Sequence, residues 1–170
     1  MNNIDQLATR EEQWLKKQHG LVGDRGTLYE QVGVYAAWRD IFRQYVSLAR
    51  KGDLEALKRA LYFVWAEHSI GPLGTGIKNL DEDLATEALG IADRLAVDDR
   101  PDAELEWMLP YYYVVDPAYL DRFEDLDALK RTSREHPFLY RQRCQETSFD
   151  HRGQMGEYWK AKQAHLRRWP

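Results

Sequence analysis

The strongest helical signal in the chain is in residues 27–61, which read TLYEQVGVYAAWRDIFRQYVSLARKGDLEALKRAL. Thr27 and Glu30 have the spacing of a capping box, which predicts that a helix begins at Thr27. Apolar side chains then recur at helical spacing, and a second apolar row widens the face. Gly52 is a typical C-terminal cap and Asp53 a typical N-cap, so a second helix should follow directly. We expect these two helices to form an apolar hairpin that other helices must cover.

The remaining sequence predicts further helices, and the 170 residues are expected to form a single all-α domain of seven or eight helices. The expected parts are an N-terminal helix arm at 1–20, the central helical hairpin at 27–69, acidic helices at 79–132 and basic C-terminal helices at 137–170. Antiparallel hairpins of this kind build either an irregular bundle or a short solenoid-like stack. No residue-level repeat separates these two arrangements, so both remain open.

Proline and glycine set several of the expected helix ends. Pro101 can open a helix, and Pro110 should kink that helix or end it near Met108. Residues 111–115 are expected to be helical, because no partner strand is predicted elsewhere. The glycine-rich run at 71–76 lacks the lysine spacing and the preceding strand of a phosphate-binding loop. It is therefore interpreted as a turn between helices.

Composition restricts the class of protein. Hydrophobic residues make up 44% of the chain and charged residues 31%, as in ordinary globular proteins. No apolar run approaches the roughly 20 residues that a membrane span needs, and the N-terminus lacks the pattern of a secretory signal. Cys144 is the single cysteine, which excludes an internal disulfide. We expect a cytoplasmic protein with no membrane segment, no metal and no cofactor.

Charge is distributed unevenly along the sequence. Residues 81–127 contain 15 acidic and 3 basic residues, whereas residues 128–170 contain 10 basic and 4 acidic residues. The basic tail carries cations and tryptophans that could touch nucleic acid, but the simpler expectation is that it packs near the acidic middle. Binding of nucleic acid is accordingly not expected.

The acidic middle combines carboxylates with aromatic residues, and it is the candidate binding surface. Three successive tyrosines on a helix cannot all face one core, so at least one should reach the surface. The sequence does not indicate which of the three this is. Aromatic anchors within a negative rim suit a basic protein partner, as in an immunity protein or an inhibitor. The alternative is a solvated acidic face with its aromatics turned inward. The candidate partner-binding residues are Asp102, Glu104, Glu106, Trp107, Tyr111, Tyr112, Tyr113, Asp116 and Tyr119.

Two enzymatic alternatives involve histidines. Arg131 and His136 have the R-x4-H spacing that resembles the motif of the HEPN class, an all-α class that includes RNases, although Thr132 replaces the usual Asn, Asp or His. The resemblance implies that Arg131 stabilises phosphate charge and that His136 transfers protons. Pro137 argues against placing both residues on one helix. His68 is the other candidate base, and otherwise reads as a partly buried histidine at a helix C-terminus.

A structural or oligomerisation module is the third alternative. Its signature would be an exposed apolar stripe on the first helix, formed by Ile4, Leu7 and Trp14.

Overall fold

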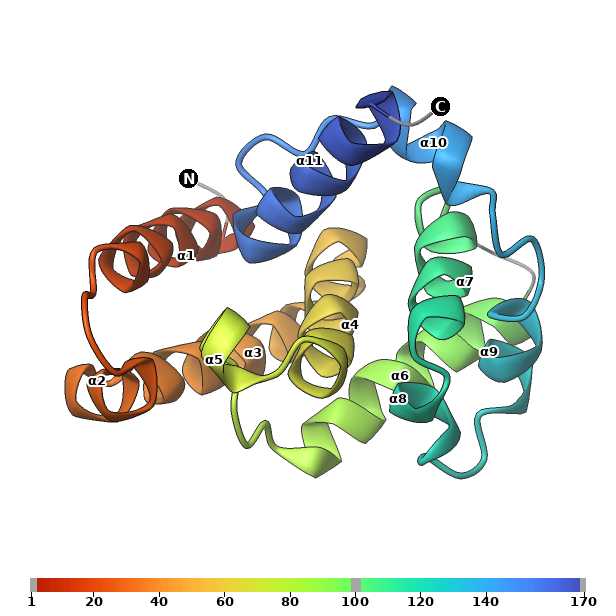
Figure 1. The fold of residues 1–170 in the computed structure, drawn as a ribbon. Helices are drawn as coiled ribbons and strands as arrows, with labels where there is room; N and C mark the ends of the chain where they lie inside the picture. The colour runs from red at the N-terminus through yellow and green to blue at the C-terminus, as the bar shows by residue number, and fades with distance from the viewer. Residues whose placement is uncertain (1–2, 99–101, 169–170) are drawn as a thin grey trace.

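The computed structural model describes residues 3–98 and 102–168, which contain eleven helices and no strand (Figure 1). The helices are α1 (Asn3–His19), α2 (Arg25–Val32), α3 (Val34–Ala49), α4 (Leu54–Ser69), α5 (Pro72–Thr75), α6 (Glu82–Val97), α7 (Leu105–Val115), α8 (Ala118–Asp121), α9 (Asp127–Thr132), α10 (Tyr140–Glu146) and α11 (Gly153–Arg168). The all-α class is confirmed, whereas the count of seven or eight is not. Four helices of only four to seven residues, α5, α8, α9 and α10, account for most of the difference.

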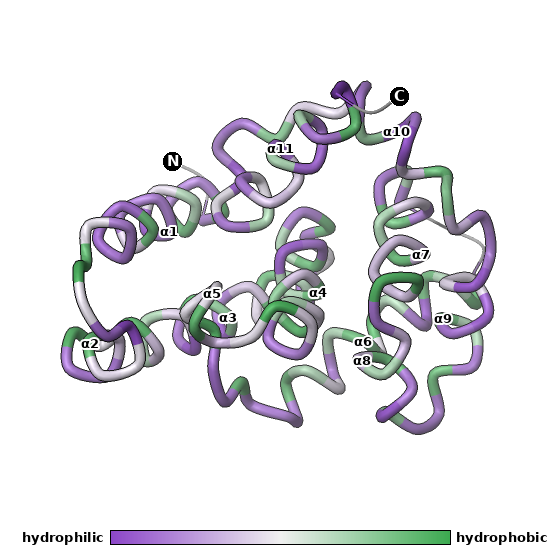
Figure 2. Tube along the Cα trace, viewed as in Figure 1, coloured by the Kyte–Doolittle hydropathy of each residue, from purple (hydrophilic) through white to green (hydrophobic). Residues whose placement is uncertain are grey.

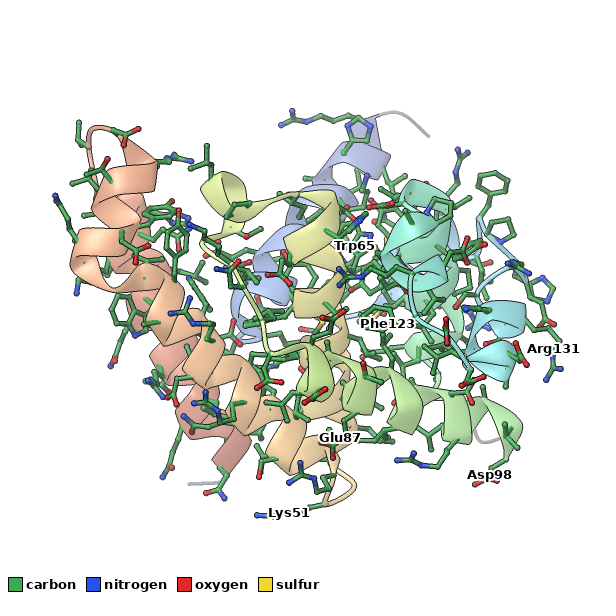
Figure 3. The ribbon with its side chains drawn as sticks, turned by 90° about the horizontal axis from the view of Figure 1, so that it is seen from below. Lys51, Trp65, Glu87, Asp98, Phe123 and Arg131 are labelled. Atoms are coloured by element: carbon green, nitrogen blue, oxygen red, sulfur yellow. The ribbon has the colours of Figure 1, made fainter. Side chains whose placement is uncertain are left out.

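Helix α4 lies at the centre of the molecule. Every residue from Ala56 to Ala66 is buried, and the helix packs against α3, α6, α7, α8 and α11. Trp65 points from α4 into the interior (Figure 3). Such a helix must be covered on every side, and all the other helices except α5 contribute residues to the hydrophobic core around it.

Helix α1 is mostly hydrophilic, as Figure 2 shows, but it uses its apolar positions inside the protein. Ile4 and Leu7 are buried, and Trp14 is partly buried against the core with Lys17 over its ring. The exposed apolar stripe expected for an oligomerisation module is therefore not present on this helix. The reason is that α3 and α11 both cover it.

The long helix predicted from Thr27 is divided at Gly33. This glycine has φ of 82°, a left-handed conformation that ends α2 and precedes α3. The capping box prediction was wrong as well, because Asp24 is the N-cap. Its Oδ2 accepts a hydrogen bond of 2.9 Å from the backbone N–H of Thr27, and the helix begins at Arg25.

The predictions made from prolines and from the glycine-rich run have mixed outcomes. Helix α7 continues past Pro110 to Val115, so the helical assignment of 111–115 is confirmed and an end near Met108 is not. The proposed start at Pro101 lies outside the described residues. The run at 71–76 is a turn between helices that contains the short α5, which confirms that interpretation.

A buried polar cluster joins the first helix to the last. Glu11 on α1 is fully buried, and its carboxylate accepts hydrogen bonds from the Tyr45 hydroxyl and, at 2.8 Å, from the backbone N–H of Gln154. Arg59 on α4 lies 3.6 Å from the same carboxylate. Burial raises the pKa of Glu11 to about 6, against the opposing effects of Arg59, Tyr45 and Gln154. Glu11 thus supplies an acceptor at the N-terminus of α11, where backbone N–H groups have no partner within the helix.

None of the helices in residues 3–98 and 102–168 has the length and apolar character that crossing a membrane requires.

Candidate functional site

Four of the predicted partner-binding residues are part of the hydrophobic core. Trp107, Tyr111, Tyr112 and Tyr119 are between 1% and 3% exposed. The Tyr112 ring stacks on Trp65 with centroids 4.7 Å apart. These rings therefore face inward, and they are not available at the surface as anchors for a partner.

Tyr113 is the one of the three successive tyrosines that reaches the surface, because Tyr111 and Tyr112 are buried. Its hydroxyl donates to the carboxylate of Asp121 at 3.2 Å and accepts from Nε of Arg134 at 3.1 Å. The Arg134 guanidinium also lies over its ring. Tyr113 is thus surrounded by charge, but it is already occupied by neighbours from its own chain.

Glu104 is neutralised within the chain. Its Oε2 lies 2.5 Å from Nζ of Lys58 and 2.7 Å from Nη2 of Arg152, which also contacts Glu55 at 2.5 Å. Burial disfavours the charged form of Glu104, but the hydrogen bonds from Arg152 and Lys58 outweigh it and hold its pKa below the ordinary value. Arg152 belongs to the basic segment 128–170 and Glu104 to the acidic segment 81–127. Their contact is an ion pair of the kind expected if the basic segment packs near the acidic one.

Asp116 pairs with the candidate base His68. Its Oδ2 lies 2.6 Å from Nδ1 of His68 and accepts a 2.8 Å hydrogen bond from the Ser69 hydroxyl. Burial raises the pKa of Asp116, but the hydrogen bonds from His68 and Ser69 outweigh it and lower the pKa overall. A carboxylate on Nδ1 leaves Nε2 of a neutral imidazole as the acceptor, which is the orientation of a general base. Residue 116 is 48 positions from His68, so the sequence alone did not reveal this partner.

Arg131 and His136 do not share a helix. Helix α9 ends at Thr132, before His136, as the proline at 137 had indicated. His136 itself has a left-handed backbone, with φ of 49°. Arg131 is exposed and points away from the body of the protein (Figure 3). His136 lines a cavity to which Arg131 does not contribute. The structure therefore does not bring the two together at one site.

This cavity, here called the acidic pocket, lies between the end of α6, helix α7 and the segment that follows α9. Its volume is about 410 Å³, within the range of ligand-binding pockets. Its apolar lining consists of Ala92, Leu95, Ala96, Leu105, Leu109, Pro110 and Leu139. Its polar lining consists of Asp102, Glu106, Thr132, Glu135 and His136.

Carboxylates dominate the charge of the acidic pocket. Its described lining includes three carboxylates and no Lys or Arg. Glu106 and Glu135 are exposed and make no ion pair with a described residue, whereas Asp102 lies 3.6 Å from Nζ of Lys58. Asp102 also accepts hydrogen bonds from the backbone N–H groups of Glu104 and Leu105, which fixes its position at the start of α7. The unpaired charge of the pocket therefore comes mainly from Glu106 and Glu135.

Backbone dipoles add to this negative potential. Leu95 and Ala96 lie in the last turn of α6, where the C-terminal carbonyl groups carry partial negative charge. Pro110 has no N–H, so it cannot donate to the carbonyl oxygen of Glu106 one turn earlier. Carboxylates and carbonyl oxygens together favour a cationic group beside an apolar one.

Sequence reasoning identified Asp102 and Glu106 but missed Glu135 and Leu139, which form the opposite wall. Glu135 stands in a segment with net positive charge, and neither residue belongs to a periodic pattern. Only the folding of 133–139 back against α7 places them at the pocket.

Comparison of this chain with protein-family models, with curated proteins and with solved structures gives no match. Within the part of the chain that the structure describes, no group of three or more His, Cys, Asp or Glu residues could hold a metal ion.

Proposed function

We propose that this chain is a non-enzymatic, cytoplasmic protein-binding module that engages a basic partner through the acidic pocket, in the manner of an immunity protein or an inhibitor. The observation that supports this is the described lining of the pocket: an apolar floor, three carboxylates and no Lys or Arg. Apolar burial supplies affinity, and the carboxylates steer and orient a basic partner. The same negative charge disfavours phosphate, so nucleic acid is not the proposed partner.

The proposed occupant is an apolar side chain of the partner with Lys or Arg on either side of it. The aliphatic floor takes the apolar side chain, and the cations reach Glu106 on α7 and Glu135 on the opposite wall. This proposal retains the carboxylates of the partner-binding surface that was predicted from the sequence. It assigns the anchoring role to aliphatic residues such as Leu109 and Leu139, because the expected aromatic anchors are buried.

The test uses a designed amphipathic peptide of Leu and Lys, and a matched peptide in which every Lys is replaced by Glu. Binding is measured by calorimetry at about 0.05 M and about 0.5 M salt, a range over which the screening length falls severalfold. The double variant Glu106→Lys, Glu135→Lys should abolish binding of the Lys peptide. Glu124→Lys is the control for a Glu-to-Lys charge reversal outside the pocket, because Glu124 is exposed and is not part of the pocket lining.

We expect the Lys peptide to bind at low salt and to be released at high salt, and the Glu peptide not to bind. Equal binding by the double variant and the control would overturn the proposal. The same variants then serve as bait in a pull-down from the host lysate. A natural partner of the pocket must be retained by Glu124→Lys and lost by the double variant.

An enzymatic role for His68 is the second candidate, and the 2.6 Å contact with Asp116 is the observation in its favour. A base that works through Nε2 requires this carboxylate to orient the ring. His68→Ala and Asp116→Asn should then both abolish any hydrolytic activity found in a screen. An activity that survives both substitutions would exclude His68 as the base.

A further inference from the structure

A second cavity lies where α1, α4, α5 and α11 meet. Its volume is about 210 Å³. Figure 1 shows α1 and α11 on one side of this region and α4 and α5 on the other. Three of its lining side chains, Gln18, Tyr62 and Gln154, are only 5%, 2% and 6% exposed. Of their polar atoms, Oε1 of Gln154 is buried without a hydrogen-bond partner among the described residues, and buried polar groups normally have one.

The amide of Gln18 has a defined orientation. The indole Nε1–H of Trp38 can only donate, so the Gln18 atom 3.0 Å away must be the carbonyl oxygen Oε1. Gly76 holds this pair tightly, because a Cβ at that position would come within 2.8 Å of both atoms. The Nε2 group of Gln18 has no acceptor among the described residues. It is therefore a free donor at the cavity.

The amide of Gln154 is fixed in the opposite sense. Its Nε2 donates to the backbone carbonyl of Thr75 at 2.8 Å, and a carbonyl can only accept. The remaining atom is Oε1, which is buried and receives no hydrogen bond from the described residues. Gln154 thus brings a free acceptor to the cavity that Gln18 supplies with a donor.

Two tyrosines also line the cavity, together with the ionisable side chains of His19 and Glu157. The rings of Tyr62 and Tyr158 both line it, with centroids 5.8 Å apart. The Tyr158 hydroxyl is paired with that of Tyr111, whereas the Tyr62 hydroxyl has no partner among the described residues. The lining therefore combines aromatic surface with a donor, an acceptor and a hydroxyl that can act as either.

We propose that this cavity binds a small planar ligand with an N–H donor beside a carbonyl acceptor, which is the edge of a primary amide or a lactam. The ligand N–H donates to Oε1 of Gln154, and the ligand carbonyl accepts from Nε2 of Gln18. The Tyr62 hydroxyl makes a third hydrogen bond, and the tyrosine rings contact the plane of the ligand. This site is separate from the acidic pocket and does not depend on the function proposed for it.

The test uses benzamide and uracil as probes, and N,N-dimethylbenzamide as a matched compound that has no N–H. Binding is followed by NMR through the side-chain amide signals of Gln18 and Gln154 in the intact protein. The variant Tyr62→Phe removes only the hydroxyl. Tyr119→Phe is its control, because the Tyr119 hydroxyl has no partner among the described residues but lies in α8, outside this cavity.

We expect benzamide and uracil to shift both side-chain amide signals in a saturable way. Tyr62→Phe should weaken binding about three- to tenfold, the loss that corresponds to one hydrogen bond. Tyr119→Phe should bind as the wild type does. The proposal is overturned if no probe shifts these signals, as for a cavity that holds only water, or if N,N-dimethylbenzamide binds as well as benzamide.

Discussion

The carboxylate of Glu11 accepts a 2.8 Å hydrogen bond from the backbone N–H of Gln154, so the first helix of the described chain caps the last. The two residues are 143 positions apart. Gly153 precedes Gln154 with φ of 57°, and it leaves the space that the Glu11 carboxylate occupies. Several predictions about stability depend on this contact and on its neighbours.

Gly153→Ala should be strongly destabilising. The new Cβ would overlap the Glu11 carboxylate, and the left-handed backbone adds strain. Gly52→Ala is the matched control, since Gly52 has φ of 93° but no atom within 4 Å of the added Cβ. From backbone strain alone, the control should lose about 1–2 kcal/mol of unfolding free energy. Urea denaturation should show a clearly larger loss for Gly153→Ala, and equal losses would contradict the close contact.

Glu11→Gln should change how stability depends on pH. The folded-state pKa of Glu11 is raised from 4.5 to about 6, with Tyr45, Arg59, Glu55 and the Gln154 N–H as its neighbours. Its contribution is therefore fully present below pH 4.5 and is lost as pH rises through 6. The shift corresponds to about 2 kcal/mol, at about 1.4 kcal/mol per pKa unit.

The measurement is the difference in unfolding free energy between the variant and the wild type at pH 4.5 and pH 7.5. As pH rises over this range, the unfolding free energy of Glu11→Gln should increase relative to that of the wild type by about 2 kcal/mol. Carboxylates with lowered pKa, such as Glu104, titrate in both proteins and cancel in the difference. A difference that does not vary with pH would mean that Glu11 titrates normally.

Arg152→Ala should be far more damaging than loss of a surface arginine. The Arg152 guanidinium joins Glu55 and Glu104, and its side chain is only 11% exposed. Breaking a buried ion pair costs about 3–5 kcal/mol, because a charge is left without its partner. Arg50→Ala is the control, since the side chain of Arg50 is 57% exposed and its pair with Glu87 should contribute no more than about 1 kcal/mol. Similar losses for both variants in denaturant titrations would refute the buried character of the Arg152 cluster.

Cys144 should resist thiol reagents while the protein is folded. Burial raises the pKa of the thiol to about 11, and only the thiolate reacts quickly. At pH 8, labelling by a disulfide reagent should be slow in buffer and fast in concentrated urea. Rapid labelling of the folded protein would show that α10 opens readily and exposes the thiol.

Local features of the fold could be predicted from the sequence, because helix periodicity and caps depend on neighbouring residues. The cap at Asp53 and the helix that follows it are as expected. The break at Gly33 was missed, since glycine within an apolar helical pattern gives no sign that its φ will be positive. The short helices after α7 carry too few turns to show a period.

The candidate site could be predicted only in part, because its walls come from distant segments. Charge counting found the acidic region that contains Glu106 but could not reveal that Glu104 is neutralised by Arg152. Aromatic content could not indicate that Tyr111 and Tyr112 face the core. Glu135 reaches the pocket only through the fold of the chain after α9.

The dependence of α11 on Glu11 also affects the order in which the protein can assemble. During synthesis, α1, α3 and α4 are complete long before Gly153 leaves the ribosome. Until then the Glu11 carboxylate lacks the N–H donor from Gln154, and Trp159 is not yet present to cover Trp107 and Tyr111. The packing of α1 on α3 can form earlier, whereas the covering of Trp107 and Tyr111 and the capping of α11 by Glu11 wait for the last helix.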